Sequence, residues 1–167
     1  MTDEQPSAGR FSRRTIVKGA AWSVPIIAAA VATPLAAAST DVEVGAFALR
    51  GTCGTLGLLG PGFTLTAGTA PLPVGTTLLI NGSGVANVGV FGVSGGTASV
   101  SVLSGTSRLI TLTSALPAGA TIAFRSTLSI TVAFTLNGIT TLPSGYIATG
   151  SKPTGTVSST LVLCSGT

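Results

Sequence analysis

Residues 39–167 are predicted to form an all-β domain built as a β-sandwich, with a closed β-barrel as the alternative. Three observations lead to this fold class. Apolar and polar residues alternate with a period of two from Thr121 to Asn137, as in a strand with one buried face. Glycine-containing turn signals recur at fairly regular spacing between short apolar runs. No window of residues 39–167 shows the 3.6-residue period of an amphipathic helix.

About eight or nine short strands account for this pattern. The candidate strands are residues 41–49, 55–59, 62–67, 76–81, 85–93, 97–103, 107–113, 121–137 and 156–164. The run 121–137 would be about 50 Å long at ~3.3 Å per residue, which is too long for a small domain. We therefore expect a bend or bulge near Arg125 and Ser126, where the chain passes from one sheet to the other.

Four dipeptides predict the turns between these strands. Asn81-Gly82 and Asn137-Gly138 directly follow apolar runs. Asn-Gly tolerates the positive φ angles of a type I′ turn, so each of the two predicts a hairpin. Gly95-Gly96 and Ser104-Gly105 predict turns after later strands in the same way.

The motif Leu-Pro-x-Gly occurs three times, beginning at Leu72, Leu116 and Leu142. In such a loop proline presets φ, glycine allows the reversal and leucine closes the end of the core. The loop resembles the strand-entry turns of bacterial immunoglobulin-like surface modules. This resemblance implies an immunoglobulin-like Greek-key β-sandwich of about seven to nine strands.

The first 38 residues have the layout of an export signal. Ser12–Lys18 reads Ser-Arg-Arg-Thr-Ile-Val-Lys, and the run that follows is apolar but diluted by glycine, serine and two prolines. The segment resembles the twin-arginine (Tat) consensus at Arg13, Arg14 and Lys18, and is similar to the leaders of small actinobacterial cell-envelope proteins. The resemblance implies the twin-arginine translocase as a partner during export, for a chain that is already folded.

The leader ends in a small-residue cleavage site. Ala36 and Ala38 form an A-x-A pattern, so signal peptidase is expected to cleave before Ser39. The alternative is an uncleaved anchor, because residues 19–38 are long enough to cross a bilayer at ~1.5 Å per residue. We predict a signal peptide at 1–38 and one secreted domain at 39–167, with no stable membrane span in the mature form.

The mature part is close to neutral. Its charged residues are Arg50, Arg108, Arg125, Lys152, Asp41 and Glu43, which gives +2 of the chain's net charge of +4. The four basic residues are scattered, with no stripe that would follow a phosphate backbone. Nucleic acid is therefore not an expected partner.

Cys53 and Cys164 are the only cysteines, and in an exported protein two cysteines predict one disulfide. Its loop spans nearly the whole domain, and the chain-entropy model gives about 4–5 kcal/mol of stabilisation. A redox or metal-binding thiol pair is the alternative, but the chain has no histidine and no C-x-x-C motif. Because the twin-arginine route carries folded chains, we expect the disulfide to form after export.

The inventory of reactive groups predicts no catalytic residue, no cofactor and no metal, and therefore no enzyme. The lack of histidine excludes a Ser-His-Asp triad. Asp41 and Glu43 share a strand face, but their place near the mature N-terminus favours a solvated leading strand. Ser151 and Lys152 lie in a turn-like stretch, and Tyr146 is assigned a structural role rather than an exposed contact.

These features predict a secreted or cell-envelope protein with a structural, adhesive or interaction role. Envelope components or a second copy of the chain are the expected partners. The alternatives are a small-ligand-binding module with an apolar cleft between the sheets, and a self-assembling surface-layer or fibre subunit. Low charge and extended alternating strands favour the last of these.

Overall fold

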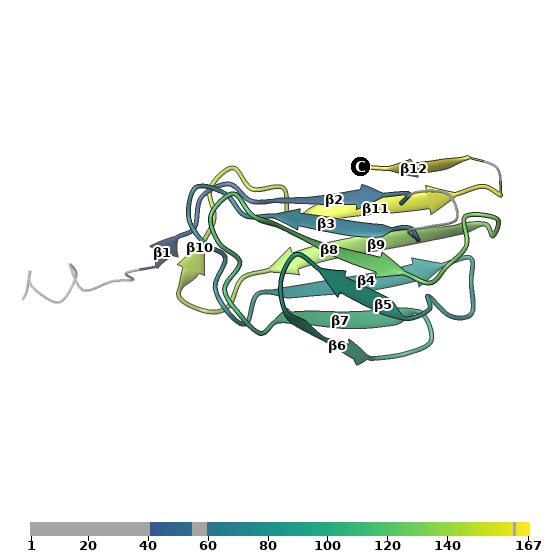
Figure 1. Ribbon diagram of the computed structural model, residues 1–167, viewed down its shortest axis with the longest axis horizontal. Coiled ribbons are helices and arrows are strands. Elements are labelled where there is room, and N and C mark those ends of the chain that lie inside the picture. The colour runs from purple at the N-terminus through teal and green to yellow at the C-terminus, as the bar shows by residue number, and fades with distance from the viewer. Residues whose placement is uncertain (1–40, 55–59, 162) are drawn as a thin grey trace, which may run out of the picture. The chain divides into compact units, whose positions relative to one another are not determined.

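The computed structural model describes residues 41–54, 60–161 and 163–167. These residues form twelve strands and no helix, arranged as a β-sandwich in which no sheet closes into a barrel (Figure 1). Nine of the twelve strands have four or more residues. The predicted all-β sandwich is confirmed, and the barrel alternative is wrong.

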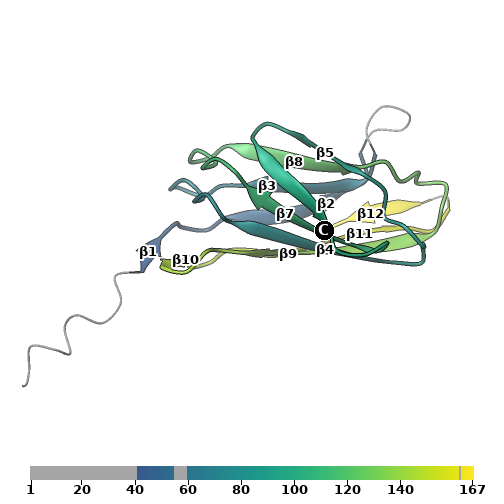
Figure 2. The same cartoon turned by 90° about the horizontal axis from the view of Figure 1, so that it is seen from below.

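Two sheets make the sandwich, and Figure 2 shows them as two layers. The smaller sheet contains, in order, β2 (Ala48–Thr52), β3 (Gly62–Thr66), β8 (Thr121–Ser126) and β5 (Phe91–Ser94). The larger contains β12 (Cys164–Gly166), β11 (Thr154–Ser159), β9 (Phe134–Thr141), β4 (Thr77–Ser83), β7 (Ser107–Leu112) and β6 (Ala98–Val102). β1 (Val42–Glu43) and β10 (Tyr146–Ile147) form a separate parallel pair.

The strand order is that of an immunoglobulin-like domain. In chain order β2, β3, β4, β5, β8, β9 and β11 take the places of its seven strands, with four in one sheet and three in the other. The β6–β7 hairpin is inserted between the fourth and fifth of these strands and extends the larger sheet beyond β4. The strand β12 follows the seventh and lies at the opposite edge of that sheet.

The core lies between the sheets and follows from the period of two. In β3 and β8 alternate residues are buried, including Phe63 and Phe124, while their neighbours face outward. Gly138 of β9 lies where a Cβ atom would be 2.9 Å from the Phe63 ring and 3.1 Å from a Leu49 methyl. A glycine at this position lets the two sheets approach closely.

The two Asn-Gly hairpin predictions are wrong. Asn81-Gly82 lies inside β4 and Asn137-Gly138 inside β9, and Asn81 is the register partner of Asn137. Both glycines are needed for packing space rather than for a turn, since a Cβ atom on Gly82 would be 2.2 Å from the Val88 side chain. The predicted turns at Gly95-Gly96, where Gly95 has a φ of 82°, and at Ser104-Gly105 are confirmed.

The run 121–137 breaks where the sequence predicted. β8 ends at Ser126 in the smaller sheet, and β9 begins at Phe134 in the larger one. The Ser126 hydroxyl donates to the Val88 carbonyl oxygen at 2.5 Å and accepts from the Leu128 N–H at 3.1 Å, which fixes the point of departure.

Three other predicted strands differ from the structure in extent. The predicted strand 41–49 is interrupted at Gly45, whose φ is 72°. Of 85–93 only the end is a strand, because β5 begins at Phe91. The predicted strand 156–164 is divided between β11 and β12. The candidate strand 55–59 lies outside the described residues.

The sheets, the buried core and the disulfide belong to a single compact unit, Asp41–Thr167. Within the described residues no helix has the length and apolar character needed to cross a membrane. The leader, with Arg13, Arg14, Lys18, Ala36, Ala38 and Ser39, lies outside the described residues.

Candidate functional site

One long side of the sandwich is closed by a disulfide and by main-chain contacts. Cys53, which follows β2, is bonded to Cys164 in β12, with their Cα atoms 5.8 Å apart and 111 positions between them in sequence. The Gly51 N–H donates to the Thr167 carbonyl oxygen at 2.7 Å. A Cβ atom on Gly51 would lie 2.0 Å from the Thr156 carbonyl oxygen, so only glycine fits here. The predicted disulfide is confirmed, and it ties the edge strand β12 to the end of β2.

The Glu43 carboxylate is held by hydrogen bonds within the domain. Its carboxylate accepts hydrogen bonds from the Gly45 N–H at 2.9 Å, the Thr149 N–H at 2.8 Å and the Thr149 hydroxyl at 2.8 Å. The hydrogen bonds from Thr149 hold the pKa of Glu43 below its usual value. This carboxylate therefore fastens the β1–β10 end of the domain, and it is not poised to take up a proton.

The stretch around Ser151 and Lys152 pairs with β2 rather than forming an isolated turn. The Lys152 N–H donates to the Phe47 carbonyl oxygen at 2.8 Å, and the Leu49 N–H donates to the Lys152 carbonyl oxygen at 2.8 Å. The Lys152 side chain is exposed. Tyr146 lies in β10 with 36% of its surface exposed, so its ring is not part of the core.

Arg108 is a buried cation that sequence reasoning missed. It is only 4% exposed, and its guanidinium donates to the Asn87 Oδ1 at 3.0 Å and to the carbonyl oxygens of Gly89 at 3.0 Å and Ser107 at 2.9 Å. It also donates to the Ser104 carbonyl oxygen. These contacts join the β4–β5 connection to the β6–β7 turn. Alternation along β7 was the available signal, because Arg108 occupies an inward-facing position between Ser107 and Leu109.

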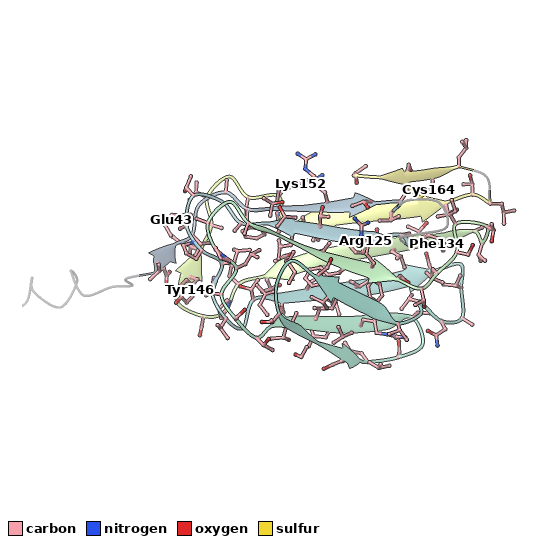
Figure 3. All side chains as sticks on the ribbon, viewed as in Figure 1. Glu43, Arg125, Phe134, Tyr146, Lys152 and Cys164 are labelled. Atoms are coloured by element: carbon pink, nitrogen blue, oxygen red, sulfur yellow. A yellow bond between two sulfur atoms is a disulfide. The ribbon has the colours of Figure 1, made fainter. Side chains whose placement is uncertain are left out.

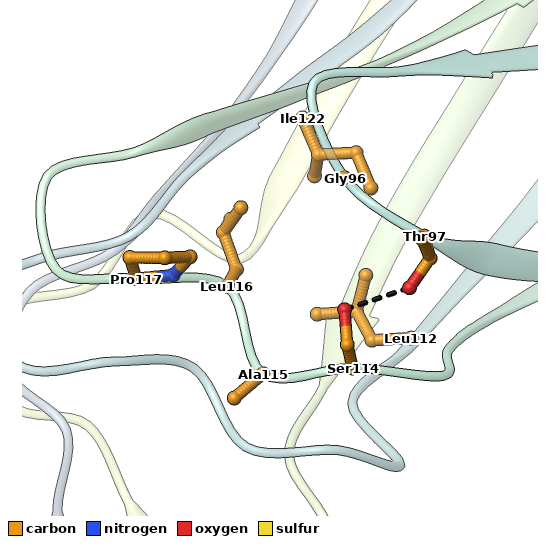
Figure 4. Close-up of a pocket in the computed structure, with 8 residues that line it drawn as sticks. All are labelled: Gly96, Thr97, Leu112, Ser114, Ala115, Leu116, Pro117 and Ile122. Atoms are coloured by element: carbon orange, nitrogen blue, oxygen red, sulfur yellow. Dashed lines mark hydrogen bonds between the residues drawn. The ribbon is translucent and has the colours of Figure 1, made fainter.

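A small hollow opens at the end of the sandwich opposite Arg108, beside the connection between β5 and β6 (Figure 4). It has a volume of about 230 Å³ and is mostly apolar. A hydrogen bond of 2.7 Å between the Thr97 and Ser114 hydroxyls lies at its wall. Its lining residues are Gly96, Thr97, Leu112, Ser114, Ala115, Leu116, Pro117 and Ile122. Drug-sized ligands usually occupy about 300–1,000 Å³, so this hollow suits only a very small ligand.

The best candidate for an interaction site is the free edge of the larger sheet, formed by β6. The Leu103 N–H donates to the Ser107 carbonyl oxygen, and the Thr113 N–H donates to the Thr97 carbonyl oxygen. In this register the main-chain groups of Ser99 and Ser101 also point toward β7. The N–H and C=O groups of Ala98, Val100 and Val102 therefore point away from the sheet. No charged residue or proline lies in β6, although both commonly protect such edges.

Within the part of the chain that the structure describes, no group of three or more His, Cys, Asp and Glu side chains is placed to hold a metal ion. Among the candidate residues that the structure describes, Cys53 and Cys164 are joined in the disulfide, and Glu43 and Tyr146 lie in the paired strands β1 and β10. Comparison of the chain with protein-family models, with curated proteins and with solved structures finds no match.

Proposed function

We propose that this chain is an exported, non-enzymatic protein that acts outside the cytoplasm as a structural or adhesive module. The disulfide between Cys53 and Cys164 supports an oxidising compartment, and the Arg13-Arg14 motif supports the twin-arginine route. The open β6 edge is the observation that carries the interaction role. A strand edge binds another extended chain by main-chain hydrogen bonds, which need no catalytic group.

A second candidate, the self-assembling surface subunit, is favoured by the symmetry of β6. Two copies related by a two-fold axis through Val100 would place each Val100 opposite its counterpart, and Ala98 opposite Val102. All three residues carry the outward-facing backbone groups, so this register satisfies the edge in both copies. The small-ligand alternative rests on the hollow beside Leu116, whose volume of about 230 Å³ makes it the weaker candidate.

The export step is tested with the pair Arg13→Lys and Arg14→Lys. We expect the double variant to remain in the cytoplasm, because a twin-arginine signal depends on the guanidinium pair rather than on charge alone. The measurement is the fraction of chain found outside the cytoplasm and shortened at Ser39. Arg10→Lys, which lies outside the motif, is the matched control. Normal export of the double variant would contradict the proposed route.

The edge is tested with Val102→Pro in residues 39–167. Proline removes an outward-facing N–H and so blocks edge pairing, but it costs no hydrogen bond to β7. We expect self-association or envelope binding to fall about ten-fold or more, measured by sedimentation velocity and by pull-down with intact cell envelope. Val102→Ala is the matched control, because it keeps the N–H. Equal association of the two variants would rule out the β6 edge.

A further inference from the structure

Exposed aliphatic side chains are more numerous at one end of the sandwich than at the other, where Val42, Val74 and Ile147 are exposed. Three connections leave at the end where β2 and β11 finish, namely residues 84–90, 103–106 and 127–133, and the described residues 53–54, 60–61, 160–161 and 163 lie at the same end. The exposed aliphatic side chains that the structure describes in these loops are 42–75% exposed. We call this set the apolar loop end, and it consists of Val90, Leu103, Val132, Leu161 and Leu163.

Charged residues are distributed unevenly between the two ends of the sandwich. None of the described residues in these connections is Asp, Glu, Lys or Arg. The two carboxylates, Asp41 and Glu43, lie before and within β1 at the opposite end, where Figure 3 also places Tyr146. Arg50 in β2 and Arg125 in β8 lie on the outward face of the smaller sheet, and Arg125 is the last residue but one before the 127–133 connection. The apolar loop end is therefore flanked by cations and remote from both carboxylates.

Leu161 has a backbone conformation that leucine rarely adopts. Its φ is 73°, and it is the only non-glycine residue with a positive φ in the described part of the chain. Asparagine and glycine are favoured in this conformation. With 59% of its surface exposed at the β11–β12 turn, Leu161 adds little to the core. Fold stability thus does not explain a leucine here, and strained residues of this kind tend to occur at functional surfaces.

We propose that the apolar loop end docks on a lipid bilayer that carries anionic headgroups. In this arrangement the aliphatic side chains enter the outer part of the hydrocarbon, and Arg50 and Arg125 lie near the headgroups. The inference is independent of the β6 edge, because Val102 is not part of the apolar loop end. Hydrocarbon contact needs no directional partner, whereas anionic lipid attracts nearby Lys and Arg side chains.

A lipid surface fits these residues better than a protein partner does. The apolar loop end is entirely aliphatic, while the energetic centres of protein interfaces are enriched in Trp, Tyr and Arg. Leu161 and Leu103 follow β11 and β6, which are four strand intervals apart in the larger sheet. At about 4.8 Å per interval, the strands β11 and β6 are about 19 Å apart. Separate contacts at this spacing meet a flat fluid surface together without the shape complementarity that a protein partner requires.

The test uses residues 39–167 and sedimentation with vesicles of equimolar phosphatidylcholine and phosphatidylglycerol. We expect the domain to sediment with these vesicles, and less with vesicles of phosphatidylcholine alone. The double variant Leu161→Asn with Leu163→Ser is expected to bind the mixed vesicles at least about ten-fold more weakly than the unaltered domain. Val74→Ser is the matched control, because Val74 is 55% exposed but lies in the β3–β4 connection at the opposite end.

The double variant also separates lost binding from lost folding. Asparagine suits the φ of position 161, so the melting temperature is expected to stay unchanged or rise. Three results would overturn the proposal: no sedimentation with the mixed vesicles, equal binding by the double variant and the unaltered domain, or equal binding to the two kinds of vesicle. A dimer in the absence of vesicles that the double variant abolishes would instead assign the apolar loop end to a second copy of the chain.

Discussion

Arg108→Ala is expected to lower the free energy of unfolding by about 2–4 kcal/mol, because it removes the packing of a buried side chain and several hydrogen bonds from a charged donor. The guanidinium is 4% exposed and donates to Asn87 and to the carbonyl oxygens of Ser104, Ser107 and Gly89. Alanine removes the charged donor, whose hydrogen bonds contribute about 1.5–3 kcal/mol each, but the acceptors lie on exposed or half-buried residues where water replaces part of this loss. The change is measured by urea denaturation of residues 39–167.

Two further variants isolate the reason for this loss. Arg50→Ala is the control for removing a cation, and because Arg50 is exposed we expect a change within about 0.5 kcal/mol. Arg108→Lys keeps the charge but lacks the planar fork of donors, so it should fall between the unaltered domain and Arg108→Ala. A loss below about 1 kcal/mol for Arg108→Ala would show that water replaces the guanidinium at little cost.

The architecture follows from local patterns wherever one sheet face is buried and the other is wet. The alternation in Thr121–Asn137 identifies β8 and β9, and its excessive length predicts the crossing between sheets after Ser126. Asn81-Gly82 and Asn137-Gly138 mislead because local turn chemistry and tertiary packing make opposite demands on glycine. In both places packing prevails, since Val88 and Phe63 occupy the space that a Cβ atom would take.

The candidate sites could be predicted only in part. The Cys53–Cys164 bond follows from counting cysteines in a chain that is expected to be exported, whatever the details of the fold. The β6 edge depends on which strand ends a sheet, and strand order is decided by contacts between distant residues. The apolar loop end likewise depends on the topology. Five strands, β7 to β11, lie between Leu103 and Leu161 in sequence, and only the sheet order brings the two residues to the same end.

Replacing both cysteines, Cys53→Ser with Cys164→Ser, is expected to lower the free energy of unfolding by about 4–5 kcal/mol. The bond joins residues 111 positions apart, and closing a loop of that length restricts the unfolded chain by about this amount. The corresponding fall in melting temperature is about 10–20 °C. Thermal unfolding followed by circular dichroism measures the change.

The double variant should nevertheless remain folded. Main-chain contacts hold β12 without the bond, because Ser158 pairs with Ser165 across the β11–β12 hairpin and Gly51 donates to the Thr167 carbonyl oxygen at 2.7 Å. Folding before the disulfide forms is what the proposed export in a folded state requires. Reductant should lower the melting temperature of the unaltered domain to that of the double variant and leave the double variant unchanged. Equal melting temperatures with and without the bond would contradict its stabilising role, and an unfolded double variant would contradict folding before export.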